Sequence, residues 1–237
     1  MNGRTITLRA DDGGEFSAYI VAPNGRSAPG IVLLHEIFGL TDWNKEIADT
    51  FAAAGYCVAA PEMFSRLERN FFAGLNDPEQ TEKGLRFRGL VDHGLAMNDI
   101  ESVIADLNTM AQCNGKFGVV GFFFGGTLAY LTAARLNVDA AVAYYGTQIH
   151  EFLDEAGAVT CPTLLHMGTA DDHIPEPLRE QIRVASATNP AIAIHLYDAG
   201  HAFANSARTA YYSERTSRIA HARTFELFDA LRSPSLS

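Results

Sequence analysis

The sequence lacks the features that mark membrane, secreted or nucleic-acid-binding proteins. No apolar run approaches the roughly 20 residues that cross a bilayer, and the start of the chain, Met1–Thr5, has no apolar secretion core. Only 18 lysines and arginines stand against 28 acidic residues, a net charge of −10. Binding to nucleic acid or anionic lipid normally starts from a basic surface. We therefore expect a soluble, cytoplasmic protein that binds neither nucleic acid nor membranes.

Cysteine is also scarce. Cys57, Cys113 and Cys161 are far apart and have apolar neighbours, and an odd number of separated thiols does not make a disulfide framework. The sequence has no Cys-x-x-Cys pair and no zinc-finger spacing of histidine and cysteine. We expect three reduced, buried thiols and neither a metal ion nor another cofactor.

The composition favours one packed core. The 237 residues are 47% hydrophobic, with 20 glycines and nine prolines, which argues against a disordered or collagen-like chain. A chain of this length buries roughly 70–75% of its unfolded surface and needs no disulfide or metal to fold. Because no linker, repeat or low-complexity tract interrupts it, we predict a single domain over residues 1–237, as a monomer or small homo-oligomer.

Short apolar runs alternate with helical patterns along the chain. Residues 5–10 and 16–22 alternate in polarity around a turn at 11–14, which is typical of an antiparallel hairpin. Six continuous apolar runs follow, as in parallel strands covered on both faces. These runs are 31–34, 56–60, 117–120, 141–145, 163–166 and 192–196. Helical stretches are expected at 43–54, 92–110, 125–136 and 216–232. We predict an α/β fold: a mostly parallel sheet of about eight strands, with an antiparallel N-terminal edge and helices on both faces.

Residues 65–88 do not follow this alternation. The segment is polar and contains the pair Phe71-Phe72 and a break at Asp77-Pro78. It is either a surface excursion or a flap over the carboxyl ends of the strands, where ligands bind in open α/β sheets. The sequence does not decide between the two.

The segment from Gly121 to Gly126 has the frame of a nucleophile elbow, a tight turn between a buried strand and a helix. The turn is strained, so the residues two before and two after its centre must lack side chains. Gly121 and Gly125 meet this demand, although a glycine pair also serves close helix packing alone. The central residue of a working elbow is the nucleophile, but here it is Phe123, and a phenyl ring cannot attack a carbonyl.

An acid and a histidine follow in the order found in α/β hydrolases, where the elbow comes first, the acid second and the histidine last. Residues 168–175 follow one predicted strand and contain Asp171 and Asp172, and His201 follows the next strand. Asp171 has the better spacing to the Ile-Pro pair after it, and Asp172 is the alternative. His201 is the predicted base.

Residues 35–39 (His-Glu-Ile-Phe-Gly) lead from an early strand into a loop. In α/β hydrolases this loop donates one backbone N–H to the oxyanion, and the residue after the nucleophile donates another. The predicted donors are therefore the backbone N–H groups of Ile37 and Phe124. Backbone donors survive a change of side chain, so an anion pocket would persist without the nucleophile.

Together these motifs resemble the dienelactone hydrolase (carboxymethylenebutenolidase) family of the α/β-hydrolase superfamily, over about residues 5–230. The motifs are His35-Glu36-Ile37-Phe38-Gly39, Ala53-x-Gly55-Tyr56-x-Val58-x-x-Pro61, Gly121-x-x-x-Gly125-Gly126, Gly168-x-x-Asp171-x-x-Ile174-Pro175 and Gly200-His201-x-Phe203. The resemblance implies a single-domain α/β-hydrolase fold and a Cys-His-Asp triad that opens small lactones or esters, such as dienelactone. It places Phe123, Asp171 and His201 at the triad positions. It also implies that Glu36 contacts the cysteine and helps control its ionisation.

The substrate contacts depart from the family pattern as well. The family's basic and tyrosine side chains that hold a substrate carboxylate fall at Thr81 and Leu85, and the arginine expected after the histidine is Asn205. Four arginines are candidate replacements: Arg66, Arg86, Arg88 and Arg208. The residues assigned to substrate binding are Arg86, Asn205 and Phe38.

Three explanations of Phe123 remain open. The chain is a hydrolase of small esters or lactones with an impaired or altered mechanism, in which Glu36 and His201 activate water directly. Alternatively it is a non-catalytic ligand-binding or regulatory relative of the same fold. Finally, the natural gene encodes a different residue at position 123. The expected ligand is a small ester, lactone or carboxylate.

Overall fold

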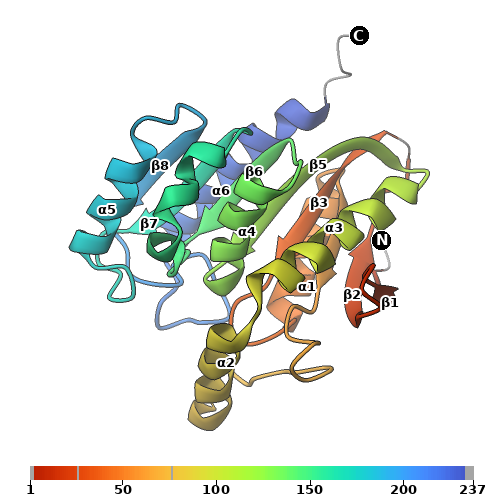
Figure 1. The fold of residues 1–237 in the computed structure, drawn as a ribbon, viewed down its shortest axis with the longest axis horizontal. Coiled ribbons are helices and arrows are strands. Elements are labelled where there is room, and N and C mark those ends of the chain that lie inside the picture. The colour runs from red at the N-terminus through yellow and green to blue at the C-terminus, as the bar shows by residue number, and fades with distance from the viewer. Residues whose placement is uncertain (1–2, 26, 76, 233–237) are drawn as a thin grey trace. The chain divides into compact units, whose positions relative to one another are not determined.

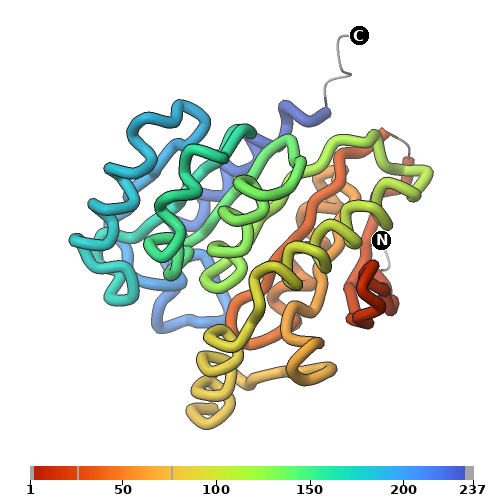
Figure 2. Tube along the Cα trace, viewed as in Figure 1, coloured from red at the N-terminus to blue at the C-terminus, as the bar shows by residue number. Residues whose placement is uncertain are grey.

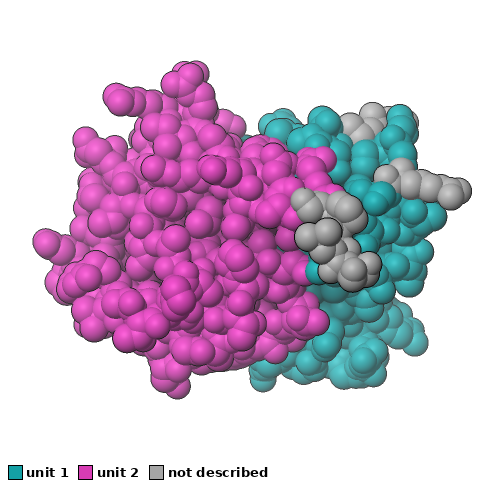
Figure 3. All heavy atoms as spheres, turned by 90° about the horizontal axis from the view of Figure 1, so that it is seen from above, with its two compact units in different colours: residues 1–118 teal, residues 119–237 magenta. Residues whose placement is uncertain are grey.

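The computed structural model describes residues 3–25, 27–75 and 77–232. Its eight strands form a mostly parallel sheet in the order β1-β2-β4-β3-β5-β6-β7-β8. The predicted α/β class, strand number and antiparallel N-terminal edge are thus confirmed. Residue contacts divide the chain into two compact units, called here the N-terminal unit (1–118) and the C-terminal unit (119–237) (Figure 3). The single domain over 1–237 stays a prediction.

The N-terminal unit begins with the expected hairpin. Strands β1 (Arg4–Arg9) and β2 (Glu15–Val21) pair antiparallel, and Gly13 in the turn has φ 85°, a conformation that glycine adopts without strain. Strand β2 also pairs antiparallel with β4 (Cys57–Pro61), which pairs in parallel with β3 (Ala28–Leu34). Every residue of β3 and β4 is buried, as expected for strands covered on both faces.

Helices α1 (Asp42–Ala53) and α3 (His93–Thr109) cover these strands from opposite sides (Figure 1). Helix α1 begins with a reciprocal cap, in which the side chains of Thr41 and Asn44 bond each other's backbone N–H groups. It ends just before Gly55, whose φ of 93° turns the chain into β4. Both helices match their predicted ranges within two residues.

The segment 65–88 contains most of a helix that the sequence did not predict, α2 (Pro78–Leu90). Asp77 caps it and proline occupies its first turn. Only Gly84 and Phe87 of this helix are buried, so it has no apolar stripe for periodicity to detect. Figure 2 shows the irregular orange-to-yellow loop that precedes it.

The C-terminal unit contains three further parallel strands. They are β6 (Ala140–Tyr144), β7 (Thr163–Gly168) and β8 (Ile192–Tyr197). Strand β5 (Cys113–Phe122) runs from the first unit into the second. Cys113 was expected to precede this strand and to be buried, but it is the first residue of β5 and partly exposed. The first four residues of β5 all keep some exposure, and burial begins only at Phe117.

The helices of this unit are α4 (Phe124–Arg135), α5 (Glu176–Ser186) and α6 (Glu214–Asp229). Short 3₁₀ helices span Ile149–Glu151, Leu153–Ala158 and Ala230–Arg232. Figure 1 shows α4 in front of β6 and α6 behind it, and both helices contact that strand. Helix α5 was not predicted, whereas α4 and α6 agree with the sequence patterns. Within the described residues, no helix is long and apolar enough to cross a membrane.

Candidate active site

Phe123 connects β5 directly to α4 and has φ 53° and ψ −111°. A non-glycine residue in this conformation costs on the order of 1–3 kcal/mol and persists only where the surroundings hold it. The Phe123 N–H donates to the Tyr144 carbonyl at 2.9 Å. A Cβ atom on Gly121 would lie 1.8 Å from the Gly125 carbonyl oxygen. The strained turn and its glycine requirement are therefore present around a phenylalanine.

His201 and Asp171 form a buried pair in the C-terminal unit. The His201 Nδ1 lies 2.9 Å from Asp171 Oδ2, and the other Asp171 oxygen accepts the His173 N–H at 2.8 Å. Because an ionised carboxylate only accepts hydrogen bonds, Nδ1 carries the imidazole proton and Nε2 is left as an acceptor. The geometry brings Asp171 to His201, while Asp172 is exposed.

The His201 ring packs against aromatic neighbours, among them the phenyl ring of Phe123. The two rings meet edge to face with 4.6 Å between their centroids, and Phe123 is only 3% exposed. Among the described residues, His201 Nε2 is buried without a hydrogen-bond partner. A buried nitrogen that lacks a partner costs about 1–3 kcal/mol, so this atom marks a place where the fold keeps an acceptor for a reason other than stability.

Burial lowers the pKa of His201, and the hydrogen bond that its Nδ1–H donates to Asp171 opposes that shift. The nearby charges of His173 and Arg208 lower the pKa further. The imidazole is consequently neutral near pH 7, which is the form that accepts a proton.

His173 is a neighbour of this pair that the sequence did not single out. Its ring lies 4.4 Å from that of His201 and 5.7 Å from that of Phe123, centroid to centroid, and the residue is exposed. The position of His173 close to Asp171 in the sequence was the available signal. The turn brings its N–H to Asp171, its ring lies beside that of His201, and no pattern in the sequence reports this arrangement.

The turn after β3 lies in the N-terminal unit, where Glu36, Ile37 and Phe38 are all buried. The Phe38 carbonyl accepts the Ala73 N–H at 3.0 Å. A Cβ atom on Gly84 of α2 would lie 2.2 Å from the Ile37 carbonyl oxygen. The turn is thus enclosed by the loop before α2 and by α2 itself. The other predicted oxyanion donor, Phe124, is the first residue of α4, where the helix dipole favours negative charge.

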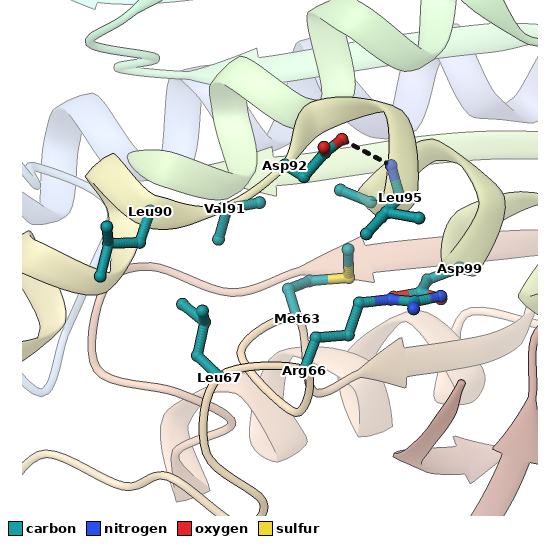
Figure 4. Close-up of a pocket in the computed structure, with 9 residues that line it drawn as sticks. Met63, Arg66, Leu67, Leu90, Val91, Asp92, Leu95 and Asp99 are labelled. Atoms are coloured by element: carbon teal, nitrogen blue, oxygen red, sulfur yellow. Dashed lines mark hydrogen bonds and ion pairs between the residues drawn. The ribbon is translucent and has the colours of Figure 1, made fainter.

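Arg66 is wrong as a candidate for holding a substrate carboxylate. Its guanidinium donates to Asp99 at 2.6 and 2.8 Å and to Asp12 at 2.9 and 3.0 Å. Figure 4 shows Arg66 beside Asp99 at one side of a hollow of about 170 Å³ that is lined mainly by aliphatic side chains such as Leu67 and Leu90. A guanidinium held between two carboxylates is not available for a third.

The remaining substrate-binding assignments are placed as follows. Arg86 is exposed on α2. Asn205 is buried, and its side-chain oxygen accepts the Ala207 N–H at 3.0 Å. The substrate contacts of both residues and of Phe38 stay predictions. In the described ranges, no group of three or more His, Cys, Asp or Glu side chains is arranged to hold a metal ion.

A strained strand–helix turn, followed later in the chain by an Asp–His pair just after β7 and β8, is typical of the α/β-hydrolase type of fold. Solved structures agree. A putative dienelactone hydrolase from Klebsiella pneumoniae superposes with a TM-score of 0.84 at 26% identity, covering 97% of this chain and 99% of that one.

Sequence comparison gives the family. The family model "Dienelactone hydrolase family" matches residues 16–231, and the chain belongs to this family. It is 32% identical to carboxymethylenebutenolidase 1 of Cupriavidus pinatubonensis over 99% of both chains. It is 31% identical to the carboxymethylenebutenolidase of Pseudomonas putida, over 96% of this chain and 97% of that one. The predicted family is confirmed.

Proposed function

We propose that this chain hydrolyses small esters or lactones, with turnover limited by the phenylalanine at the nucleophile position. Family membership and relatives named carboxymethylenebutenolidase support the reaction class. The observation that carries the proposal is the buried, unpartnered Nε2 of His201, whose ring is oriented by Asp171 and packs against residue 123 of the elbow. This is the atom that removes a proton in a triad.

Water replaces the thiol in the proposed mechanism. Nε2 of His201 takes a proton from water while the water oxygen bonds to the carbonyl carbon, and the carbonyl π electrons move to its oxygen. Backbone N–H groups, predicted at Ile37 and Phe124, stabilise the oxyanion. When the C–O bond to the leaving group breaks, His201 returns the proton to the departing alkoxide. Asp171 stabilises the imidazolium between the two transfers.

The Phe123 ring sets the limit on this reaction. Nε2 is buried in the observed conformation, and the Phe123 ring packs edge to face on the imidazole. In the proposed mechanism this ring rotates away before water reaches the base. Binding and oxyanion stabilisation without a complete triad give about 10³–10⁴-fold acceleration over water. We expect the chain to work in that range rather than at the rate of a thiol enzyme.

A second candidate function is ligand binding without turnover. It is favoured by the same ring, which is 3% exposed and lies edge-on against His201. If the Phe123 ring never rotates away from His201, the protein would bind a small ester, lactone or carboxylate and release it unchanged.

A panel of small esters and lactones, including p-nitrophenyl acetate and dienelactone, separates the two functions. His201→Asn removes the proposed base, and His221→Asn is the control because it changes a partly exposed histidine of α6 outside the Asp171 pair. Turnover that His201→Asn abolishes and His221→Asn keeps supports hydrolysis. Saturable binding in a thermal-shift assay with no product above buffer supports the second candidate.

The acidic composition and the three free cysteines support a cytoplasmic location as part of the proposal. The same acidic composition argues against nucleic acid or a membrane as the partner, and the proposed partner is a small ester, lactone or carboxylate. Fractionation of the source cells with an antibody against this chain tests the location.

A further inference from the structure

We infer that His35 is a positioning residue, which fixes the peptide plane between Glu36 and Ile37 and so aims the Ile37 N–H. The aim of that N–H matters because it is a predicted oxyanion donor, and in this respect the inference rests on the proposed function. The orientation itself follows from contacts inside the N-terminal unit.

The hydrogen bonds of His35 define its tautomer. The residue is fully buried, and its Nε2 accepts the Met63 N–H at 2.9 Å. A nitrogen that accepts carries no proton, so the imidazole proton is on Nδ1. The contact from Nδ1 goes to the Glu36 carbonyl oxygen, which can only accept. The ring therefore accepts a hydrogen bond from the Met63 N–H and donates one to the Glu36 carbonyl.

Glu62 holds the turn that carries the Met63 N–H in place. The residue is buried, and its Oε1 accepts the Phe64 N–H at 3.0 Å while its Oε2 accepts the Ser65 hydroxyl at 2.6 Å. These bonds shape the turn after β4 that presents the Met63 N–H to His35. Glu62 Oε1 lies 3.7 Å from the ring nitrogen, too far for a hydrogen bond, so the Met63 N–H is the donor that fixes the tautomer.

The geometry of the peptide bond carries the constraint to Ile37. In a trans peptide the C=O of one residue and the N–H of the next lie in one plane and point in opposite directions. Holding the Glu36 carbonyl against His35 therefore turns the Ile37 N–H away from the ring. Ile37 is 3% exposed, and in the described part of the chain its N–H has no backbone acceptor. A buried N–H without a partner needs an explanation, and an anion bound there would supply one.

The neighbouring peptide planes have other supports. Gly84 leaves room for the Ile37 carbonyl against α2, and the Ala73 N–H holds the Phe38 carbonyl. His35 is thus a side chain placed to fix the first plane of the turn, and we expect the Glu36–Ile37 plane to rotate when the donor to the Glu36 carbonyl is lost.

Two substitutions of His35 separate the two ring nitrogens. An asparagine side chain at this position would offer an amide N–H where Nδ1 donates, and a glutamine side chain would offer an amide oxygen where Nε2 accepts. His35→Asn therefore keeps the donor to Glu36 and loses the acceptor for Met63, whereas His35→Gln does the reverse. If His35 only filled space, the two variants would lose similar activity. If it only anchored Met63, His35→Asn would lose more activity than His35→Gln.

The experiment measures kcat and KM for p-nitrophenyl acetate in the unsubstituted chain and in Phe123→Cys, each with His35→Asn or His35→Gln, together with crystal structures of the two variants. We expect His35→Gln to lower kcat by about 10²-fold, the scale of losing one oxyanion donor, with KM little changed and with the Glu36 carbonyl rotated. We expect His35→Asn to keep kcat within about threefold and the peptide plane unrotated.

Equal losses in both variants, or an unrotated Glu36–Ile37 plane in His35→Gln, would overturn the inference. If no parent protein hydrolyses any ester, the proposed function fails instead, and the two crystal structures still decide whether His35 sets the plane. Unfolding midpoints in guanidinium chloride identify any variant that loses activity because it does not fold.

Discussion

Replacing Phe123 with cysteine tests whether the elbow, His201 and Asp171 form a working active site. The change puts a thiol at the elbow in place of a ring that lies 4.6 Å from the His201 ring, with Asp171 at 2.9 Å behind that histidine. A cysteine next to a histidine base has a lowered pKa and attacks as the thiolate. In a serine protease, loss of the nucleophile alone costs about 10⁶ in kcat. We therefore expect Phe123→Cys to raise ester turnover by at least about 10³-fold.

The same change lowers stability. Truncating a buried phenylalanine to alanine costs about 3–5 kcal/mol, and the sulfur of cysteine recovers part of that packing, so we expect a loss of about 2–3 kcal/mol. The strained backbone is not relieved, since cysteine at φ 53° is no easier than phenylalanine. Guanidinium unfolding of both proteins measures the difference.

The assay combines p-nitrophenyl acetate turnover with iodoacetamide labelling at neutral pH. Phe122→Cys is the matched control, because Phe122 is also buried but its ring stacks on Tyr144 with 4.7 Å between centroids. That variant should lose stability and gain no turnover. A Phe123→Cys protein that folds but neither labels faster than Phe122→Cys nor exceeds the unsubstituted chain in turnover would refute the placement of the site.

Three further predictions concern Asp171, His221 and Gly121. In the Phe123→Cys background, Asp171→Asn should lower kcat about 10⁴-fold through the wrong His201 tautomer, with an unchanged unfolding midpoint as control. Burial lowers the pKa of His221 to about 4, so the unfolded chain takes up a proton first as the pH falls. The contribution of His221 to stability should be complete above about pH 6.5 and fall by about 3 kcal/mol toward pH 4, and pH-dependent unfolding of His221→Gln should lack this part of the loss. Gly121→Ala, whose methyl group would lie 1.8 Å from a carbonyl oxygen, should unfold the chain or cost more than about 3 kcal/mol. Gly89→Ala, which meets nothing within 4 Å, should be neutral or stabilising in the same thermal scan.

The sequence predicted those parts of the fold that depend on local pattern. Buried strands such as β3 and β4 are continuous apolar runs, and the elbow glycines follow from a steric demand confined to five residues. Helix α2 could not be predicted from apolar periodicity, because only Gly84 and Phe87 of it are buried. The Asp-Pro pair at its start is a helix N-terminus signal, but the same pair also marks a break in the chain.

The positions of the site residues along the chain could be predicted from the sequence, but the partners of their side chains could not. Motif order pointed to Asp171 and His201, and the two do meet. The partners of Arg66 lie 33 and 54 residues away in the sequence, and no local pattern reports such an ion pair. The same holds for the hydrogen bond from Met63 to His35, which joins residues 28 apart.

The most direct measurement on the His201–Asp171 pair is a ¹⁵N NMR titration of the His201 ring in the unsubstituted chain. We predict a neutral imidazole at pH 7 with its proton on Nδ1, an unprotonated Nε2 and a pKa below that of a free histidine. An imidazolium at pH 7, or a proton on Nε2, would contradict the claim that the elbow faces a ready base.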